Sequence, residues 1–483
     1  MLFNSLEFFV FLPIVYFAYW FLNKRSLKLQ NLLLLIASYV FYGWWDYRFL
    51  SLILFSTVVD YFVGLRIANA PNQKTQRNYL WVSIICNLGL LGFFKYYNFF
   101  VDSFVETFSF FGHHISNVWT LKIILPVGIS FYTFQTLSYS LDIYRGKLKA
   151  TKDFVSFAAF VSFFPQLVAG PIERASNLMP QISSKRKFNY EQASDGLKLM
   201  LWGLVKKVVI ADSLAPIVDD IFTNAADYPS STLVLGAIFF GFQIYGDFSG
   251  YSDIAIGTSK LFGIELMSNF KFPYFSRNVA EFWRRWHISL STWFRDYLYI
   301  PLGGSQRGMK TTIRNVFIIF VVSGFWHGAN WTFIVWGGLH AMLFVPVLLM
   351  GKNRKYVDKP IASESFFPRL NEFFKILLTF ILITITWIFF RAQTISEALS
   401  YIVHLFSDFT YSPYMHPMGY RMVDYFILLI IFIFYEYLIK NDERTPFPFK
   451  NRIVRFLIYM VMIFGLLMFY DSGLDRSFIY FQF

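Results

Sequence analysis

The chain has 483 residues, of which 56% are hydrophobic and only 15% are charged. A soluble domain carries roughly 25% charged residues, so this sequence has too little charge to cover a surface that faces water. The formal net charge is +13, but lysine and arginine occur in short clusters between apolar runs, which argues against a nucleic-acid partner. The single cysteine, Cys86, excludes an internal disulfide framework and a multi-cysteine metal site, and we expect it to be a buried structural thiol.

Apolar stretches that can cross a bilayer of about 30 Å recur along the whole chain. They lie at residues 8–22, 29–45, 49–68, 79–94, 123–144, 232–246, 316–326, 331–350, 376–390, 424–439 and 453–470. Several are shorter than the roughly 20 residues that a straight span needs, which predicts tilted or re-entrant segments. The pattern predicts an all-α polytopic membrane protein with about 11 transmembrane helices and further re-entrant or interfacial helices.

Two apolar stretches in the centre of the chain carry residues that lipid-facing helices avoid. Residues 154–169 contain a proline, and residues 197–222 contain Lys206, Lys207 and Asp212. Charges inside apolar segments are expensive and usually face protein. We therefore expect both stretches to be buried in protein and irregular.

Clusters of Lys and Arg predict the orientation, because cytoplasmic loops carry an excess of both. We assign to the cytoplasmic side the basic clusters at residues 23–28, 66–77, 145–152, 351–359 and 440–455. We assign to the extracytoplasmic side the segments with few basic residues, at 97–120, 391–423 and 471–483. Both termini are then extracytoplasmic, and a single membrane domain accounts for residues 1–483.

The segment from Gly246 to Asp253 places two carboxylates beside glycine and serine at the end of an apolar run. Paired acids can do acid–base work or bind a cation inside a membrane. Asp and Ser beside Gly are also typical of helix caps and turns. We favour the structural interpretation, as a cap or turn.

Residues 281–297 are rich in aromatic and basic side chains and read as one amphipathic helix. Spacings of three and four place four polar residues on one side, namely Arg284, His287, Ser291 and Arg295, and allow Glu281 to pair with Arg285. Such a helix can lie in the headgroup interface. It can equally line the entry of an anionic acyl donor such as a coenzyme A or carrier thioester, and the spacing leaves both interpretations open.

The segment from Ser323 to Trp331 joins two strongly apolar stretches. Gly324 and Gly328 form a small-xxx-small pair that lets helices approach closely. Packing does not explain His327, whose imidazole can accept a proton near neutral pH. A structural hydrogen-bonding role is the alternative.

The remaining histidines are weaker candidates. His113, His114, His404 and His416 fall in predicted outer loops, and His340 lies in an apolar span without polar neighbours in the sequence. The chain has no phosphate-binding loop ending in Gly-Lys-Ser/Thr, no His-Glu-x-x-His motif and no Gly-x-Ser-x-Gly motif. Nucleotide hydrolysis, zinc proteolysis and serine-esterase chemistry therefore lose support.

Several motifs, taken together, resemble the membrane-bound O-acyltransferase superfamily, and within it the bacterial branch that O-acetylates alginate and peptidoglycan. The matching stretches are Pro126–Tyr132, Phe164–Arg174, Lys206–Asp212, Tyr251–Gly257, Phe282–Leu290, Arg295–Gly304, Phe325–Trp331 and Phe478–Phe483. The resemblance implies helices arranged around a central tunnel. It also implies that His327 is the catalytic histidine and that His287 is a second functional histidine.

The same resemblance implies transfer of an acetyl group from a cytoplasmic thioester, such as acetyl-CoA, to an extracytoplasmic polysaccharide, in the inner membrane of a bacterium. It implies an extracytoplasmic acetyltransferase partner and no bound cofactor or metal. We assign substrate binding to Arg284, Ser291, Arg295, Asn330 and Trp331. A D-alanyl transferase for teichoic acid and a transporter of a lipid or sugar precursor are the alternatives.

Overall fold

The protein is described from a computed structural model that covers residues 1–23, 25–111, 120–357, 361–362, 366–417, 419, 422–470 and 478–479. Within these residues all regular structure is helical, which confirms the predicted all-α class. The chain forms two compact units, one of residues 1–197 and 255–267 and the other of residues 198–254 and 268–483. The predicted outer-loop residues His113 and His114 lie outside the described residues. The prediction of one domain across residues 1–483 stays a prediction.

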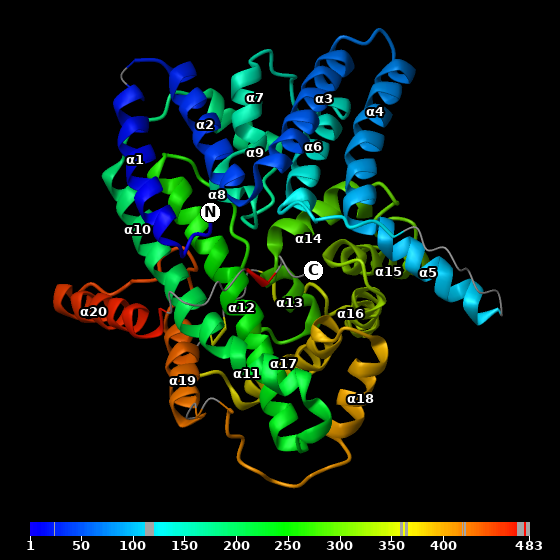
Figure 1. Ribbon diagram of the computed structural model, residues 1–483, viewed down its shortest axis with the longest axis vertical. Helices are drawn as coiled ribbons and strands as arrows, with labels where there is room; N and C mark the ends of the chain where they lie inside the picture. Colours follow the sequence, from blue (N-terminus) through cyan, green and yellow to red (C-terminus); the bar gives the residue numbers. More distant parts are fainter. Residues whose placement is uncertain are drawn as a thin grey trace. The chain divides into compact units, whose positions relative to one another are not determined.

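The first unit contains most of the N-terminal helices (Figure 1). They are α1 (Leu6–Asn23), α2 (Leu27–Asp46), η1 (Tyr47–Phe49), α3 (Leu50–Ala68), α4 (Gln73–Leu91), η2 (Gly92–Tyr96), α5 (Tyr97–Phe110), α6 (Ile129–Tyr144), α7 (Phe154–Val161), α8 (Phe164–Leu167), α9 (Ala175–Ser183) and the first part of α10 (Tyr190–Leu204). Helices α3, α4 and α6 pack together around Asp60, which accepts hydrogen bonds from Asn87 Nδ2 at 2.7 Å and Ser140 Oγ at 2.8 Å. Cys86 on α4 is half-buried, whereas the sequence predicts a buried thiol.

The second unit contains the helices that follow. They are η3 (Val205–Ala211), α11 (Asp212–Thr223), η4 (Ala225–Asp227), most of α12 (Ser230–Leu261), η5 (Pro273–Phe275), α13 (Val279–Arg285), α14 (Ile288–Phe294), η6 (Arg295–Tyr299), α15 (Met309–His327), α16 (Trp331–Leu349), α17 (Leu370–Arg391), α18 (Ile395–Leu405), α19 (Met422–Leu438) and α20 (Arg452–Phe469). The two stretches expected to be irregular are so. Residues 154–169 form two short helices, and residues 197–222 contain the π-helical segment η3.

Residues 246–253 form no cap or turn, contrary to the expectation, because they lie inside the long helix α12. Their glycines serve helix packing instead. A Cβ on Gly250 would lie 2.6 Å from the carbonyl oxygen of Gly203, so the missing side chain lets the two backbones approach. The two carboxylates of this segment face lysines of η3 and are described below.

Helices α15 and α16 form a hairpin with unusually close backbones. A Cβ on Gly324 would overlap the carbonyl oxygen of Phe333, and a Cβ on Gly337 would overlap that of Phe320. A Cβ on Gly328 would overlap the Phe333 ring. The predicted glycine contact is therefore present, with Gly337 as a partner that the sequence pattern did not include.

Six helical stretches within the described residues are long and apolar enough to cross a membrane. They are Leu27–Ala68, Gln73–Phe110, Ser230–Leu261, Trp331–Leu349, Leu370–Arg391 and Arg452–Phe469. The predicted span at 123–144 is only partly helical, because residues 120–126 have no regular structure and α6 begins after Gly128, which has a φ of 74°. The count of about 11 spans stays a prediction.

Candidate active site

The expected helix over residues 281–297 is broken at His287. Helix α13 ends before this residue and α14 begins after it, while His287 itself adopts the left-handed conformation with φ 43° and ψ 55°. The N–H of Ile288 donates to the carbonyl oxygen of Asn269 at 2.9 Å. Before the break, the carbonyl oxygen of Arg285 accepts from the N–H of Lys271, also at 2.9 Å. These bonds to a neighbouring segment replace the helical ones. A side chain held in this region costs about 1–3 kcal/mol and is typical of functional sites.

The His287 imidazole is buried, with Asn269 as its nearer polar partner and Ser289 Oγ 3.5 Å from its Nδ1. Its Nδ1 lies 3.0 Å from Asn269 Oδ1, an amide oxygen that also accepts from Ser289 Oγ at 2.9 Å, while Asn269 Nδ2 donates to Ser252 Oγ at 3.1 Å. Because an amide oxygen only accepts, Nδ1 carries the proton and Nε2 carries the lone pair. Among the described residues, Nε2 has no hydrogen-bond partner. Burial lowers the pKa of His287 to about 3, so the ring is neutral at physiological pH.

His327 is the last residue of α15 and lies close to His287. The two ring centroids are 6.2 Å apart, and only 2% of His327 is exposed. Aromatic rings surround it, with Trp336 at 5.2 Å and Phe390 at 5.5 Å between centroids. Two histidines that are 40 positions apart in the sequence are thus brought together in a buried environment rich in aromatic rings, where hydrogen bonds and developing charges act strongly.

His340 has polar partners, although its sequence neighbours are apolar. Trp283 Nε1 donates to its Nδ1 at 3.2 Å, and its Nε2 lies 3.1 Å from Thr386 Oγ1. Both ring nitrogens are therefore engaged, and His340 packs against Trp336 with centroids 4.7 Å apart. This arrangement makes His340 a structural residue of the aromatic wall beside His327.

A basic cavity of about 580 Å³ lies beside α13. Its lining includes four cationic side chains, Lys271, Arg284, Arg285 and Lys440, against the carboxylates Glu281 and Glu443. Ile288, which follows His287 directly, also lines it. The cavity therefore has an excess of positive charge and can hold an anionic group next to the segment that carries His287.

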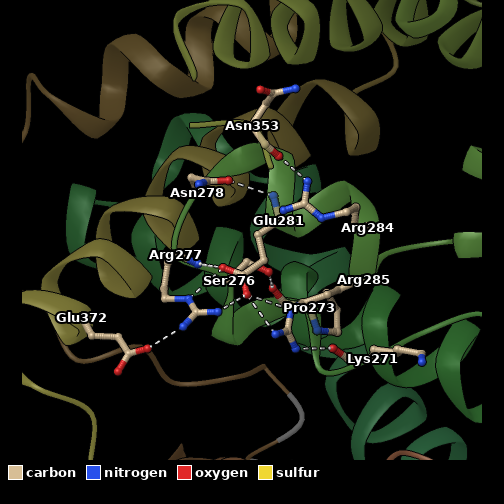
Figure 2. A network of polar contacts seen from close by, with 10 residues as sticks. All are labelled: Lys271, Pro273, Ser276, Arg277, Asn278, Glu281, Arg284, Arg285, Asn353 and Glu372. Carbon is tan, nitrogen blue, oxygen red and sulfur yellow. Dashed lines mark hydrogen bonds and ion pairs between the residues drawn. The ribbon is translucent and has the colours of Figure 1, made fainter. Parts of the chain in front are cut away.

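Figure 2 shows how the arginines of this cavity are held. Buried Glu281 accepts from Arg277 Nη2 at 2.8 Å and from Arg285 Nη2 at 2.9 Å, which confirms the predicted pairing of Glu281 with Arg285. Arg277 also pairs with Glu372 of α17 at 2.8 Å. Arg284 donates to the carbonyl oxygen of Asn353 at 2.5 Å. Paired in this way, the guanidinium groups keep fixed positions.

Residues 149–390 match the membrane-bound O-acyltransferase family. The chain belongs to this family. It is therefore a multi-pass membrane protein and an O-acyltransferase. Membership of this family argues against the alternative that the chain is a transporter. Among the described residues of this acyltransferase, no group of three or more His, Cys, Asp or Glu side chains is placed to hold a metal ion.

Individual relatives indicate which branch of the family this chain is most similar to. A probable alginate O-acetylase of Pseudomonas aeruginosa is 42% identical over 410 residues, which cover 84% of this chain and 75% of that protein. The peptidoglycan O-acetyltransferase of Helicobacter pylori is 37% identical over 428 residues, covering 83% and 78%. A teichoic acid D-alanyltransferase of Streptococcus thermophilus is 30% identical over 249 residues, covering only 48% and 59%. The O-acetylating relatives are thus the more similar ones along more of the chain.

The other residues assigned to substrate binding in this acyltransferase are spread over several elements. Ser291 on α14 is half-buried, and Arg295 is exposed and pairs with Asp296 at 2.7 Å. Neither lines the basic cavity, which on α14 includes only Ile288. Asn330 caps α16 by accepting from Thr332 N at 2.9 Å, and Trp331 is 49% exposed. Their binding roles stay predictions.

Asn269 is a residue of the candidate site that the sequence does not single out. It lies outside the family motifs and 18 positions before His287, on a segment without helical or strand periodicity. Only the pairing of that segment with the chain around His287 brings it to the site. No local pattern in the sequence carries this signal.

Proposed function

We propose that this acyltransferase moves acetyl groups from a cytoplasmic thioester, such as acetyl-CoA, to hydroxyls of an extracytoplasmic polysaccharide, in the inner membrane of a bacterium. The observation that carries the proposal is the approach of the His287 and His327 rings to 6.2 Å in a buried aromatic setting. The names of the O-acetylating relatives support acetyl as the group and an alginate-like polymer or peptidoglycan as the acceptor.

In the proposed reaction, His327 acts as the general base. The acceptor oxygen attacks the thioester carbonyl carbon while its proton passes to the imidazole of His327. The new C–O bond forms, the C–S bond breaks, and the imidazolium returns the proton to the leaving thiolate. Atoms and charges balance without a further reactant.

His287 takes a different part in this proposal. Because burial lowers its pKa to about 3, its Nε2 is a weak base and a poor proton carrier at neutral pH. With Nδ1–H bonded to Asn269, the Nε2 lone pair can accept a hydrogen bond from a second hydroxyl of the acceptor, which leaves the single O–H of the attacking hydroxyl for His327. We infer that His287 orients the nucleophile toward the carbonyl, and that His327 removes its proton.

The basic cavity supports an anionic thioester as donor. Phosphate groups bind to Arg and Lys clusters, and Arg284 is fixed by its bond to Asn353. Two lining regions, Tyr356–Val357 and Lys440–Glu443, belong to loops that the Lys and Arg bias predicts to be cytoplasmic. The donor would enter from that face, and an extracytoplasmic partner protein would hold the acceptor polymer for the transfer.

The test is acetyl transfer by the purified wild-type enzyme and its His327→Ala variant. Labelled acetyl-CoA is supplied with deacetylated polymer, with and without the proposed extracytoplasmic partner protein. The variant should remain monodisperse in detergent and lose roughly 10²- to 10⁴-fold in rate, because it loses the general base.

His404→Ala is the matched control, because His404 lies on α18, outside the motifs that carry both histidines, and it should keep the wild-type rate. Equal consumption of acetyl-CoA by wild type and His327→Ala, with both proteins monodisperse, would refute the assignment of His327. Transfer of D-alanine in place of acetyl would move the enzyme to the teichoic acid branch.

A further inference from the structure

Two buried lysines of η3 have no part in the proposed reaction. Lys206 Nζ lies 2.5 Å from Asp253, and Lys207 Nζ lies 2.8 Å from Asp212 and 2.6 Å from Asp247. The π-helical turn of η3 and the glycines of α12 bring these groups within reach. Burying two lysines and their carboxylate partners rarely increases stability. We therefore look to function for the role of these ion pairs.

The carboxylate of Asp247 is shared between two partners. One oxygen faces Lys207, and the other accepts the backbone N–H of Ile479 at 2.6 Å. Hydrogen bonds to the oxygen of a salt-bridged carboxylate are about twice as strong as bonds between neutral groups. Asp247 thus ties a residue more than two hundred positions away to the middle of α12.

The tied segment reaches the histidine site through aromatic contacts. Phe478, which is 1% exposed, lies with its ring 5.7 Å from that of Phe248 and 5.0 Å from that of Tyr251. Phe248 in turn contacts the His287 ring edge to face, with centroids 4.6 Å apart. Packed rings leave little freedom, so the position of Phe478 determines that of Phe248 and limits the tilt of His287.

We propose that Asp247, held by Lys207, is a positioning residue that anchors the segment Phe478–Ile479 against Phe248 and thereby fixes the orientation of His287. The proposal rests on the proposed function for its effect on rate, although the anchoring itself does not. It gives a purpose to Lys207, Tyr251 and Phe478, which belong to three sequence motifs that the reaction leaves unused.

A matched control lies in the same interface. Buried Lys206 and half-buried Asp253 form a pair between the same two elements, whereas the backbone N–H of Ile479 donates to Asp247. Asp253→Leu removes the carboxylate that faces Lys206, whereas Asp247→Leu leaves Lys207 its partner Asp212. Each variant removes one carboxylate that faces a buried lysine of η3, so a general loosening of this contact should appear in both.

The first experiment measures anchoring without acyl transfer. In a Cys86→Ala background, Ile479→Cys keeps the backbone N–H that bonds to Asp247 and places a thiol at a buried position. Maleimide should label this thiol slowly in the otherwise unchanged protein and in Asp253→Leu, and about tenfold or more faster in Asp247→Leu, since a buried site reacts only when its anchor opens. Equal labelling of the two aspartate variants would overturn the anchor.

The second experiment measures the effect on His287. Diethyl pyrocarbonate modification of the full-length protein, mapped by mass spectrometry, should rise at His287 in Asp247→Leu and stay unchanged in Asp253→Leu. In the acetyl-CoA assay, kcat should fall about tenfold to a hundredfold in Asp247→Leu with KM unchanged, because a small misplacement of an orienting group acts on the chemical step. Faster maleimide labelling with unchanged His287 modification would overturn the positioning role. An inactive wild type would refute the proposed function and leave both labelling results decisive.

Discussion

At the scale of single residues, the orientation of His287 depends on one amide. Asn269 Oδ1 accepts from the imidazole and from the Ser289 hydroxyl, while its Nδ2 donates to Ser252. A side chain that satisfies three neighbours cannot rotate without leaving buried groups unpaired, at about 1–3 kcal/mol each. The tautomer of His287 is therefore set from outside the histidine motif.

Asn269→Asp tests this dependence through pH. His287 lies outside the six candidate spans, and burial lowers its pKa to about 3 in the wild type. A carboxylate in place of the amide favours the charged imidazolium, so Asn269→Asp should raise this pKa. The neutral form is lost as the pH falls through the pKa. The acid limb of the kcat/KM profile should therefore move to higher pH in the variant than in the wild type.

Ser289→Ala is the control for this experiment, because it removes the hydroxyl that contacts Asn269 and lies 3.5 Å from His287 Nδ1, but it adds no charge. It should lower stability without moving the acid limb. An unchanged profile in Asn269→Asp, with normal yield of folded protein, would contradict the role assigned to the amide.

At the scale of elements, the position of His327 depends on the glycine contact between α15 and α16. Gly324 lies three residues before His327 and against the backbone of Phe333, so nothing flexible can give way. A Cβ on Gly338 of the same hairpin would instead meet open space, with no neighbouring atom within 4 Å. The two glycines therefore offer opposite environments on one pair of helices.

Gly324→Ala should destabilise the enzyme by about 1–3 kcal/mol, because the added methyl overlaps backbone and forces the helices apart. Gly338→Ala should be neutral or stabilise by up to about 1 kcal/mol through helix propensity. Thermal unfolding in detergent measures both, and acetyl transfer should fall only in the first. Equal melting temperatures for the two variants would show that the close contact is absent.

The elements also show where sequence patterns stop. Hydropathy identifies apolar helices well, because lipid leaves few alternatives to a helix. It does not show that α12 continues through residues 246–253, since turn-forming residues become packing residues when another backbone lies opposite. Nor does helical spacing over 281–297 show the break at His287, which arises from hydrogen bonds to a segment distant in sequence.

At the scale of the whole molecule, the Lys and Arg bias predicts which face each loop occupies. Three exposed positions test it in a Cys86→Ala background, with cysteine placed at Lys149, Lys355 or Tyr411. An impermeant maleimide added to intact cells should label only Tyr411→Cys. The other two should react after permeabilisation, and labelling of Lys355→Cys in intact cells would reverse the orientation.

The family could be predicted from the sequence, because its short motifs combine particular side chains, and the same motifs single out His287 and His327 as candidates whose roles stay predictions. The approach of His287 to His327 could not be derived from spacing, since it depends on how the break after α13 and the end of α15 meet. The same holds for Asp247 and Ile479, which are joined by a backbone N–H and so leave no trace in residue type.

The short turn between α15 and α16 has a consequence for biosynthesis. Only Gly328 to Asn330 separate the two helices, and α16 is among the six stretches apolar enough to span a membrane, whereas α15 is not. The translocon would then release the pair together, with α16 carrying its less apolar neighbour into lipid. Damage to this turn would appear first as degraded, uninserted protein. Membrane yield must therefore be matched before any rate measured at His327 is interpreted.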